Sequence, residues 1–254
     1  MEVFGIDLAA ILPFIAIGFA AQLVDGALGM AFGVITNTLL VGVMGVPPAQ
    51  ASQRVHVVEC FTTAVSGISH LLHRNIDPKL FFRLVIPGVI GGVTGAYLLS
   101  NIDGDVVKPF VMLYLAAIGL YLLWRGIMYP PKIREARVVA PLGLIGGFLD
   151  AAGGGGWGPV VTSNLLIQGT DPRKVVGTVS SVEFFLTLSI SATFIYHLGI
   201  ADLAGATLGL LIGGVCAAPF GAFAAKHLPA KTMLILVGTV LTITSAYAIW
   251  TAWG

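Results

Sequence analysis

The sequence contains the same passage twice, and each copy interrupts an apolar segment with an Asp followed by glycines. Residues 18–33 align without a gap on residues 143–158, which places Asp25 opposite Asp150. In secondary transporters, glycine-interrupted apolar segments in corresponding positions of two halves are the best pointer in a sequence to the binding site. Backbone groups freed by such a break can face a cavity inside the protein. The repeat therefore predicts a duplicated membrane protein whose site lies at the two breaks.

The composition restricts the chain to the membrane. Of its 254 residues, 57% are hydrophobic and only 10% are charged, whereas soluble domains carry roughly 25% charged residues. Long apolar segments that satisfy their own backbone hydrogen bonds in lipid are helices. The net charge of +1 gives no sign of a nucleic-acid partner. We therefore predict an all-α, polytopic membrane protein.

Eight apolar blocks follow one another along the chain. Six have roughly the 20-residue length of one membrane crossing, and two are longer. The blocks cover residues 8–46, 55–73, 81–99, 109–129, 138–168, 175–198, 203–225 and 232–252. The two long blocks, 8–46 and 138–168, each contain one of the broken passages. Such a block is either one kinked crossing or a hairpin whose two parts enter and leave on the same side.

The distribution of the 13 Lys and Arg residues favours the hairpin. If every block crossed once, these residues would divide six to seven between the two sides of the membrane. If both long blocks return, only Arg54 and Lys108 stay on one side and the other eleven lie opposite, as expected when short cytoplasmic loops are basic. The second half is then inverted. We predict two inverted repeats, 1–130 and 131–254, each with a broken or re-entrant hairpin plus three transmembrane helices, and both termini facing away from the cytoplasm.

The second break is rich enough in glycine to bind an anion. Its glycines permit a tight turn, and Pro159 suits the first turn of the helix that follows. Several backbone N–H groups would then converge on one concavity, which attracts anions without a basic side chain. The alternative is that the glycines only allow the chain to turn. The predicted anion site comprises Gly153, Gly154, Gly155, Gly156, Trp157 and Gly158.

Small polar residues follow each break. Asn37 and Asn164 are the better candidates for substrate contacts, because an amide needs several hydrogen-bond partners inside a membrane. Ser180 and Ser181 open the next apolar block of the second half and can donate to anion oxygens. Ser and Thr hydroxyls also commonly bond to their own helix. We predict these four side chains as substrate contacts.

Four carboxylates interrupt the apolar segments. They are Asp25, Glu59, Asp150 and Glu183. A carboxylate inside a membrane marks a functional site by default, and we predict that these four couple transport to protons or form a polar network. Glu59 and Glu183 have a structural alternative, which is pairing with His56 or Arg54. Asp25 and Asp150 have another, slightly favoured, which is capping the half-helix that follows each break.

Metal ligands are sparse in this chain. A metal site could draw on His56, Glu59, Cys60 and His70, of which His56 and Glu59 share a helix face through their spacing. No dense ligand motif is present. We therefore expect neither a metal nor a cofactor.

The second half carries the run Gly153–Pro159, the pair Asp171-Pro172 and the run Gly177–Ser181. With these motifs and its two halves of about four blocks, the chain resembles the TauE/SafE family of sulfite and organosulfonate transporters over essentially its whole length. The resemblance implies proton-coupled movement of a small sulfur-containing anion, such as sulfite or sulfoacetate, across a bacterial inner membrane. The first half departs from the family pattern, with Arg54 and His56 where the second copy has small polar residues. We expect these two side chains to give the substrate a cationic contact.

The sequence as a whole predicts a secondary transporter, and not an enzyme, that works by alternating access around a site near the middle of the membrane. Two rivals stay open: an anion channel of the same architecture, and a membrane-embedded metal-dependent enzyme that uses His56 and Glu59. The expected partners are a small anionic substrate and the lipid bilayer, without nucleic acid, and a homodimer is left open. The expected location is the bacterial cell inner membrane, which the chain would cross several times.

Overall fold

The computed structural model describes residues 2–3, 6–28, 32–72, 74–128, 137–168, 172–200 and 204–227, together with scattered helical positions between 232 and 250. Two-residue strands pair at its start, and helices make up nearly all the rest, which confirms the all-α class. The elements are β1 (Glu2–Val3), β2 (Ile6–Asp7), α1 (Leu8–Leu28), α2 (Phe32–Thr38), η1 (Leu39–Val43), α3 (Pro48–Leu72), α4 (Pro78–Asn101), α5 (Gly104–Ile127), α6 (Ala140–Gly153), η2 (Trp157–Thr162), α7 (Ser163–Gln168), α8 (Pro172–Leu198) and α9 (Ala204–His227). The segments η1 and η2 are π-helical.

Among the described residues, four helices are long and apolar enough to cross a membrane. They are α3, α4, the part Pro109–Ile127 of α5 and the part Lys174–Leu198 of α8. These helices coincide with four of the six predicted single-crossing blocks, and α9 occupies a fifth. The sixth, 232–252, lies largely outside the described residues.

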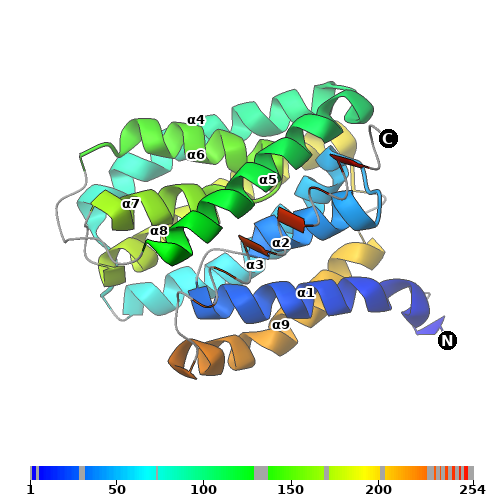
Figure 1. The fold of residues 1–254 in the computed structure, drawn as a ribbon, viewed down its shortest axis with the longest axis horizontal. Coiled ribbons are helices and arrows are strands. Elements are labelled where there is room, and N and C mark those ends of the chain that lie inside the picture. Colours follow the sequence, from blue (N-terminus) through cyan, green and yellow to red (C-terminus); the bar gives the residue numbers. More distant parts are fainter. Residues whose placement is uncertain are drawn as a thin grey trace.

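Each of the two long blocks forms a hairpin. The chain runs along α1 and then returns through α2 and η1, and in the second half it runs along α6 and returns through η2 and α7 (Figure 1). At the second break, Gly154 has a φ of 66° and ends α6 in the left-handed conformation that glycine adopts at little steric cost. The inverted relation of the halves stays a prediction, as does their boundary at residue 130, which falls among residues outside the described ranges.

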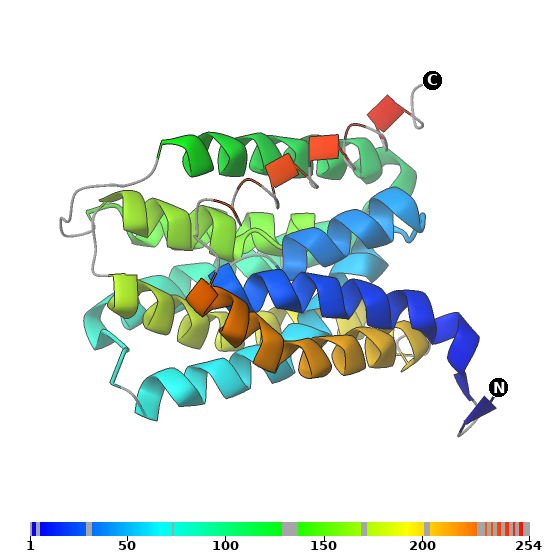
Figure 2. The same ribbon diagram turned by 60° about the horizontal axis from the view of Figure 1, so that its bottom comes forward.

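The main helix contacts join one half to the other. α1 lies along α9 (Figure 2), α4 packs on α6, and α3 packs on α8. Glycines allow close approach at these contacts: a Cβ on Gly91 would meet the backbone of Leu144, and one on Gly213 would meet the backbone of Ile15. In the sequence repeat, α1 corresponds to α6 and α3 to α8. Exchanging equivalent helices between the halves leaves the α3–α8 contact unchanged. The same exchange replaces α1 of the α1–α9 contact by α6, which is the helix that packs on α4.

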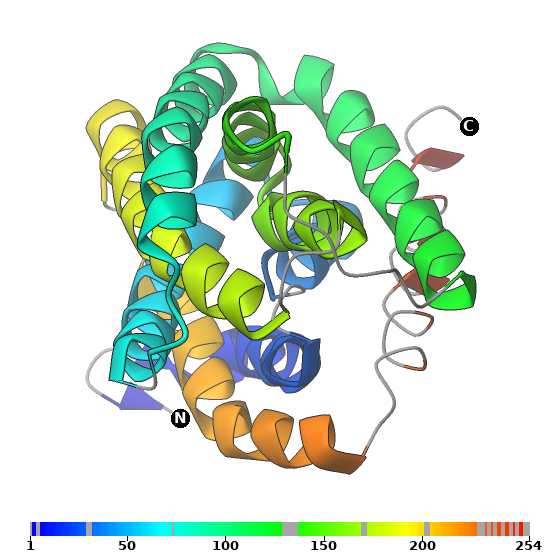
Figure 3. The same ribbon diagram turned by 90° about the vertical axis from the view of Figure 1, so that its left-hand side faces the viewer.

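The outside of the bundle is apolar, and its interior combines apolar core residues with buried polar side chains. Large apolar side chains such as Phe61, Ile86 and Leu113 are exposed, whereas Asn37 and His56 are buried. Viewed along the helices, α2 and α7 lie in the middle, with α5 on one side and α3, α4 and α8 on the other (Figure 3). Lipid tolerates such an exterior, and the protected polar interior is where a site can form.

Candidate functional site

The tips of the two hairpins meet inside the bundle. A Cβ on Gly33, near the start of α2, would lie 2.8 Å from the Cα of Gly155, which follows α6. The Asn37 side-chain amide also donates to the carbonyl oxygen of Gly153 and so joins one hairpin to the other. The two copies of the repeated passage are therefore in contact, although more than 100 residues separate them.

Both aspartates of the repeat cap the helical segment that follows their break. Asp150 Oδ1 accepts from the backbone N–H groups of Gly156 at 2.7 Å and Trp157 at 2.9 Å, and Trp157 is the first residue of η2. Asp25 Oδ1 accepts from the N–H of Phe32, the first residue of α2, at 3.2 Å. The capping alternative is thus what the structure shows for both residues.

The glycine-rich break does converge on an anion, and that anion is the carboxylate of Asp150. Gly153, Gly154, Gly155, Gly156, Trp157 and Gly158 are all buried. Besides the two bonds to its side chain, the backbone oxygen of Asp150 accepts from the N–H of Gly155 at 3.0 Å. The N–H groups that the sequence predicts for a substrate are therefore already in use, in the conformation described, by a group of the protein itself.

The His56 ring and the Asp150 carboxylate pair with each other beside the second break. His56 Nδ1 lies 2.7 Å from the carbonyl oxygen of Ser52, which can only accept, so Nδ1 carries a hydrogen. His56 Nε2 lies 3.1 Å from Asp150 Oδ2, and a hydrogen bond there requires a further proton on one of these two atoms. His56 is thus the partner of Asp150 and not, as the structural alternative had it, of Glu59.

Four carboxylates surround a small cavity at the meeting point of the hairpins. Asp25, Glu59, Asp150 and Glu183 line it together with the glycine backbone of both breaks. The centre of a water molecule can occupy about 10 Å³ of this cavity. That is space for roughly one water molecule. Like charges this close repel strongly in a medium of low dielectric constant. All four residues predicted to couple protons or form a polar network are thus brought together.

Several buried polar atoms near the hairpins have no hydrogen-bond partner among the described residues. Glu59 Oε2, Asn37 Oδ1 and the Tyr114 hydroxyl are three of them. Glu59 lines the cavity, and the Tyr114 ring lies against Gly153 and Gly156. An unpaired buried polar group costs about 1–3 kcal/mol. Such groups gather where a protein receives a ligand or a proton.

Of the twelve predicted substrate contacts, Gly155, Gly156 and Gly158 line the cavity and the other nine do not, among them Arg54, Asn164, Ser180 and Ser181. Asn164 donates instead to the Val160 carbonyl of its own helical segment at 2.7 Å, and Ser181 donates to Gly177 at 2.7 Å. Arg54 is half-buried on α3. The bond from Ser181 to Gly177 lies within one helix, which is the alternative role given above for Ser and Thr hydroxyls. Their contact with a substrate stays a prediction.

Two residues of the site were missed from the sequence. The Ser52 hydroxyl donates to the Ala151 carbonyl at 2.7 Å and so joins α3 to α6 beside the His56–Asp150 pair. Tyr114 comes from α5 and covers the glycines of the second break. Ser52 stands four residues before His56, one helical turn, and this spacing was the available signal. For Tyr114, the only signal in the sequence was a polar group within an apolar span.

The substitution Ser52→Ala should lower stability modestly. It removes one buried hydrogen bond between α3 and α6, which is worth about 1 kcal/mol, and a melting temperature measured in detergent should fall by roughly 2–4 °C. Ser100→Ala is the matched control, because the Ser100 hydroxyl bonds to Ala96 of its own helix. An equal fall in both variants would contradict a special role for the Ser52 bond.

Metal binding finds no support in the geometry of the described residues. Nowhere in the described part of the chain do three or more His, Cys, Asp or Glu side chains group as a metal would require. The residues that a metal site could have used are divided: His56 bonds to Asp150, and Cys60 contacts Ser191 at 3.4 Å.

Apolar helices that pack against each other around two meeting, broken hairpins are the architecture of a multi-pass membrane protein. The chain matches the model of the family described as "Sulfite exporter TauE/SafE" over residues 14–248. It belongs to the TauE/SafE family. It is similar to the "Probable membrane transporter protein YtnM" of Bacillus subtilis (strain 168), with 42% identity over 252 residues, 96% of this chain and 84% of that protein.

A second relative is more distant. The "Probable membrane transporter protein" of Haemophilus influenzae (strain ATCC 51907 / DSM 11121 / KW20 / Rd) is 27% identical over 226 residues, 82% of this chain and 85% of that protein. No solved structure matches the chain. The family and both relatives are named as transporters and not as enzymes. The predicted family and the transporter class are therefore confirmed.

Proposed function

We propose that the protein is a proton-coupled secondary transporter of a small sulfur-containing anion, such as sulfite or an organosulfonate like sulfoacetate, in the bacterial inner membrane. The observation that carries this proposal is that the N–H groups of Gly156 and Trp157 together donate to the carboxylate of Asp150, and so form a site for an anionic oxygen. The family description, which names sulfite, supports the substrate class. In keeping with the basic-residue count, we place both termini away from the cytoplasm.

The backbone of the second break suits an oxyanion. The N–H groups of Gly156 and Trp157 point at one carboxylate oxygen, and a helix start adds a favourable dipole. A sulfite or sulfonate oxygen, like that carboxylate oxygen, carries partial negative charge and accepts hydrogen bonds. The substrate would therefore bind where Asp150 Oδ1 now lies, after the carboxylate leaves.

Protons are needed because the site is otherwise acidic. An anion that approaches Asp25, Glu59 and Glu183 meets repulsion unless these groups are neutralised or a cation accompanies it. The proton held between His56 and Asp150 is already at the site. When it resides on Asp150, that side chain loses its charge and its grip on the backbone N–H groups weakens, since charge-assisted hydrogen bonds are about twice as strong as neutral ones. Transfer of this proton onto Asp150 thus frees the anion site.

The size of the cavity supports alternating access. Space for roughly one water cannot hold an ion of four or more heavy atoms, so the conformation described is closed around its site. Substrate entry requires the hairpin tips to part, which breaks the bond between Asn37 and Gly153. A carrier that opens and closes fits this arrangement better than a channel, which needs a continuous path.

Uptake into proteoliposomes tests this function. Labelled sulfite or sulfoacetate should accumulate when an acid-outside gradient is applied, and the rate should saturate with substrate. Uptake that rises linearly with concentration and ignores the gradient would favour the channel.

A thermal-shift screen of sulfite and small sulfonates identifies the substrate. Repeating the screen with Arg54→Ala and Asn164→Ala tests those two contacts. Unchanged affinity in both variants would remove them from the site.

The substitution His56→Gln should abolish the response to the proton gradient. Glutamine preserves much of the side-chain volume and can still bond to Ser52 and Asp150, but it cannot hold a mobile proton. We expect uptake with a gradient to fall to the rate without one. His197→Gln is the control, because His197 lies exposed at the end of α8 against Tyr97. Gradient-driven uptake that survives in His56→Gln would contradict the assigned proton site.

A further inference from the structure

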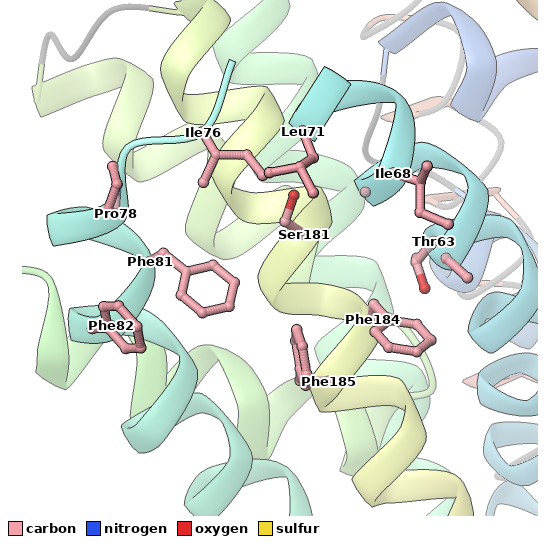
Figure 4. Close-up of a pocket in the computed structure, with 12 residues that line it drawn as sticks. Thr63, Ile68, Leu71, Ile76, Pro78, Phe81, Phe82, Ser181, Phe184 and Phe185 are labelled. Carbon is pink, nitrogen blue, oxygen red and sulfur yellow. The ribbon is translucent and has the colours of Figure 1, made fainter. Parts of the chain in front are cut away.

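A deep apolar cleft lies on the side of the bundle, separate from the carboxylate cavity. It encloses about 410 Å³ between the end of α3, the start of α4 and the middle of α8. Phe81 projects from α4 toward Phe184 and Phe185 of α8 across this space (Figure 4), and the rings of Phe81 and Phe185 meet edge to face at 5.8 Å. Its volume is that of a ligand pocket and not of a packing defect.

The lining selects an apolar occupant. Two hydroxyls reach the cleft, those of Thr63 and Ser181, and each already donates to its own helix, to Glu59 and Gly177 respectively. The remaining lining residues are apolar, among them Ile68 and Leu71. An anionic substrate would therefore find no free side-chain hydrogen-bond donor in this lining.

The cleft opens toward lipid. Ile68, Leu71 and Phe82 on its walls are 61%, 64% and 65% exposed. They belong to helices that are long and apolar enough to cross the membrane. In a bilayer the molecules next to such an opening are acyl chains, and a void would forfeit the dispersion contacts of its walls.

Exposed basic residues stand next to lining residues in the chain at one end of the cleft. Lys79 follows the lining residue Pro78 and lies one turn before Phe82 on the same face of α4, with Arg83 four residues further on. Arg74 is exposed, and the Lys174 ammonium group donates to its carbonyl oxygen and to that of Ile76, which fixes this connection.

The other charges at this end leave it positive. Asp77 is the nearby acid, and its carboxylate is engaged in capping α4 through the N–H groups of Lys79 and Leu80. Arg83 donates to the carbonyl of Arg137, which brings a further basic residue to the same end. An apolar slot with a cationic mouth is complementary to an anionic lipid, whose phosphate and acyl chain have these two characters.

We propose that this cleft is a binding site for one anionic phospholipid, with an acyl chain along the four phenylalanines and the phosphate on Arg74 and Lys79. The site is independent of the transported anion, since it shares no lining residue with the carboxylate cavity. Bound lipid bridges α3, α4 and α8, which hold the second hairpin in place.

The test compares two lipids with identical acyl chains. Purified protein in detergent is titrated with phosphatidylglycerol or with phosphatidylcholine, and melting temperature and native mass are recorded. We expect one phosphatidylglycerol to be retained and to raise the melting temperature by several degrees more than phosphatidylcholine does. Equal effects of the two lipids would overturn the proposal.

Two variants separate the headgroup from the chain. The double variant Arg74→Gln, Lys79→Gln should lose the preference for phosphatidylglycerol while both substitutions stay on the exposed surface. Ala64→Phe fills the cleft and should lose retention of either lipid, whereas Ala117→Phe on the exposed face of α5 should not. Unchanged retention in both the double variant and Ala64→Phe would overturn the site. A lipid-insensitive dimer that Ala64→Phe dissociates would overturn it as well, by showing a second copy of the chain in the cleft.

Discussion

Proton-driven uptake by the variant Asp150→Asn should fall to background while the protein stays folded. The amide oxygen that this substitution introduces can still accept from the N–H groups of Gly156 and Trp157, so the cap survives with neutral hydrogen bonds. The charge that competes with a substrate anion is gone, and so is the group that shares a proton with His56. Transport should be lost for that reason, at a cost in stability of about 1 kcal/mol.

The measurement pairs uptake in proteoliposomes with a melting curve in detergent. Asp77→Asn is the matched control, because Asp77 makes the same two-bond cap at the start of α4, at a half-buried position away from the site. We expect similar small losses of stability in both variants and a loss of uptake in Asp150→Asn alone. Wild-type uptake in Asp150→Asn would show that this carboxylate is a cap and nothing more.

The substitution Gly155→Ala should have the largest effect on folding. Gly155 has a φ of 142°, which costs a residue with a Cβ about 1–3 kcal/mol. The new methyl group would also overlap the backbone of Gly33 and Val34 in the other hairpin, and overpacking costs about 1–3 kcal/mol more. A loss of several kcal/mol is severe against a total stability of roughly 5–15 kcal/mol.

We expect a melting temperature lower by roughly 10 °C or more, or a low yield of folded protein. Gly45→Ala separates the two causes, because Gly45 also has a positive φ, of 70°, but a Cβ there meets nothing within 4 Å. It should show the smaller loss that backbone strain alone produces. Equal losses in the two variants would mean that contact between the hairpin tips contributes little.

The sequence predicted the broad arrangement because lipid leaves few choices. Block lengths and the placement of Lys and Arg are enough to indicate helices and two returning segments, and the alignment of Asp25 with Asp150 points to the place where they meet. Glu59 and Glu183 could be selected in the same way, since an acid within an apolar span is too costly to be retained without a function.

The finer contacts could not be read from the sequence because they depend on which groups meet in space. The glycines after Asp150 favour an anion in general, and no pattern shows that the carboxylate of Asp150 is that anion. Asn37 and Asn164 look alike as residues, yet one bonds across to Gly153 and the other to its own helical segment. Tyr114 reaches the site only because α5 packs against the break.

The pair formed by His56 and Asp150 has no equivalent in the other half, because Ser180 occupies the position that corresponds to His56 in the repeat. Two identical halves that exchange shapes would give inward-open and outward-open forms of equal free energy. In the transporter proposed above, a proton held beside the second hairpin alone makes these two forms unequal in free energy. The carrier should therefore rest facing one compartment, and the pH of that compartment should set how often it turns over.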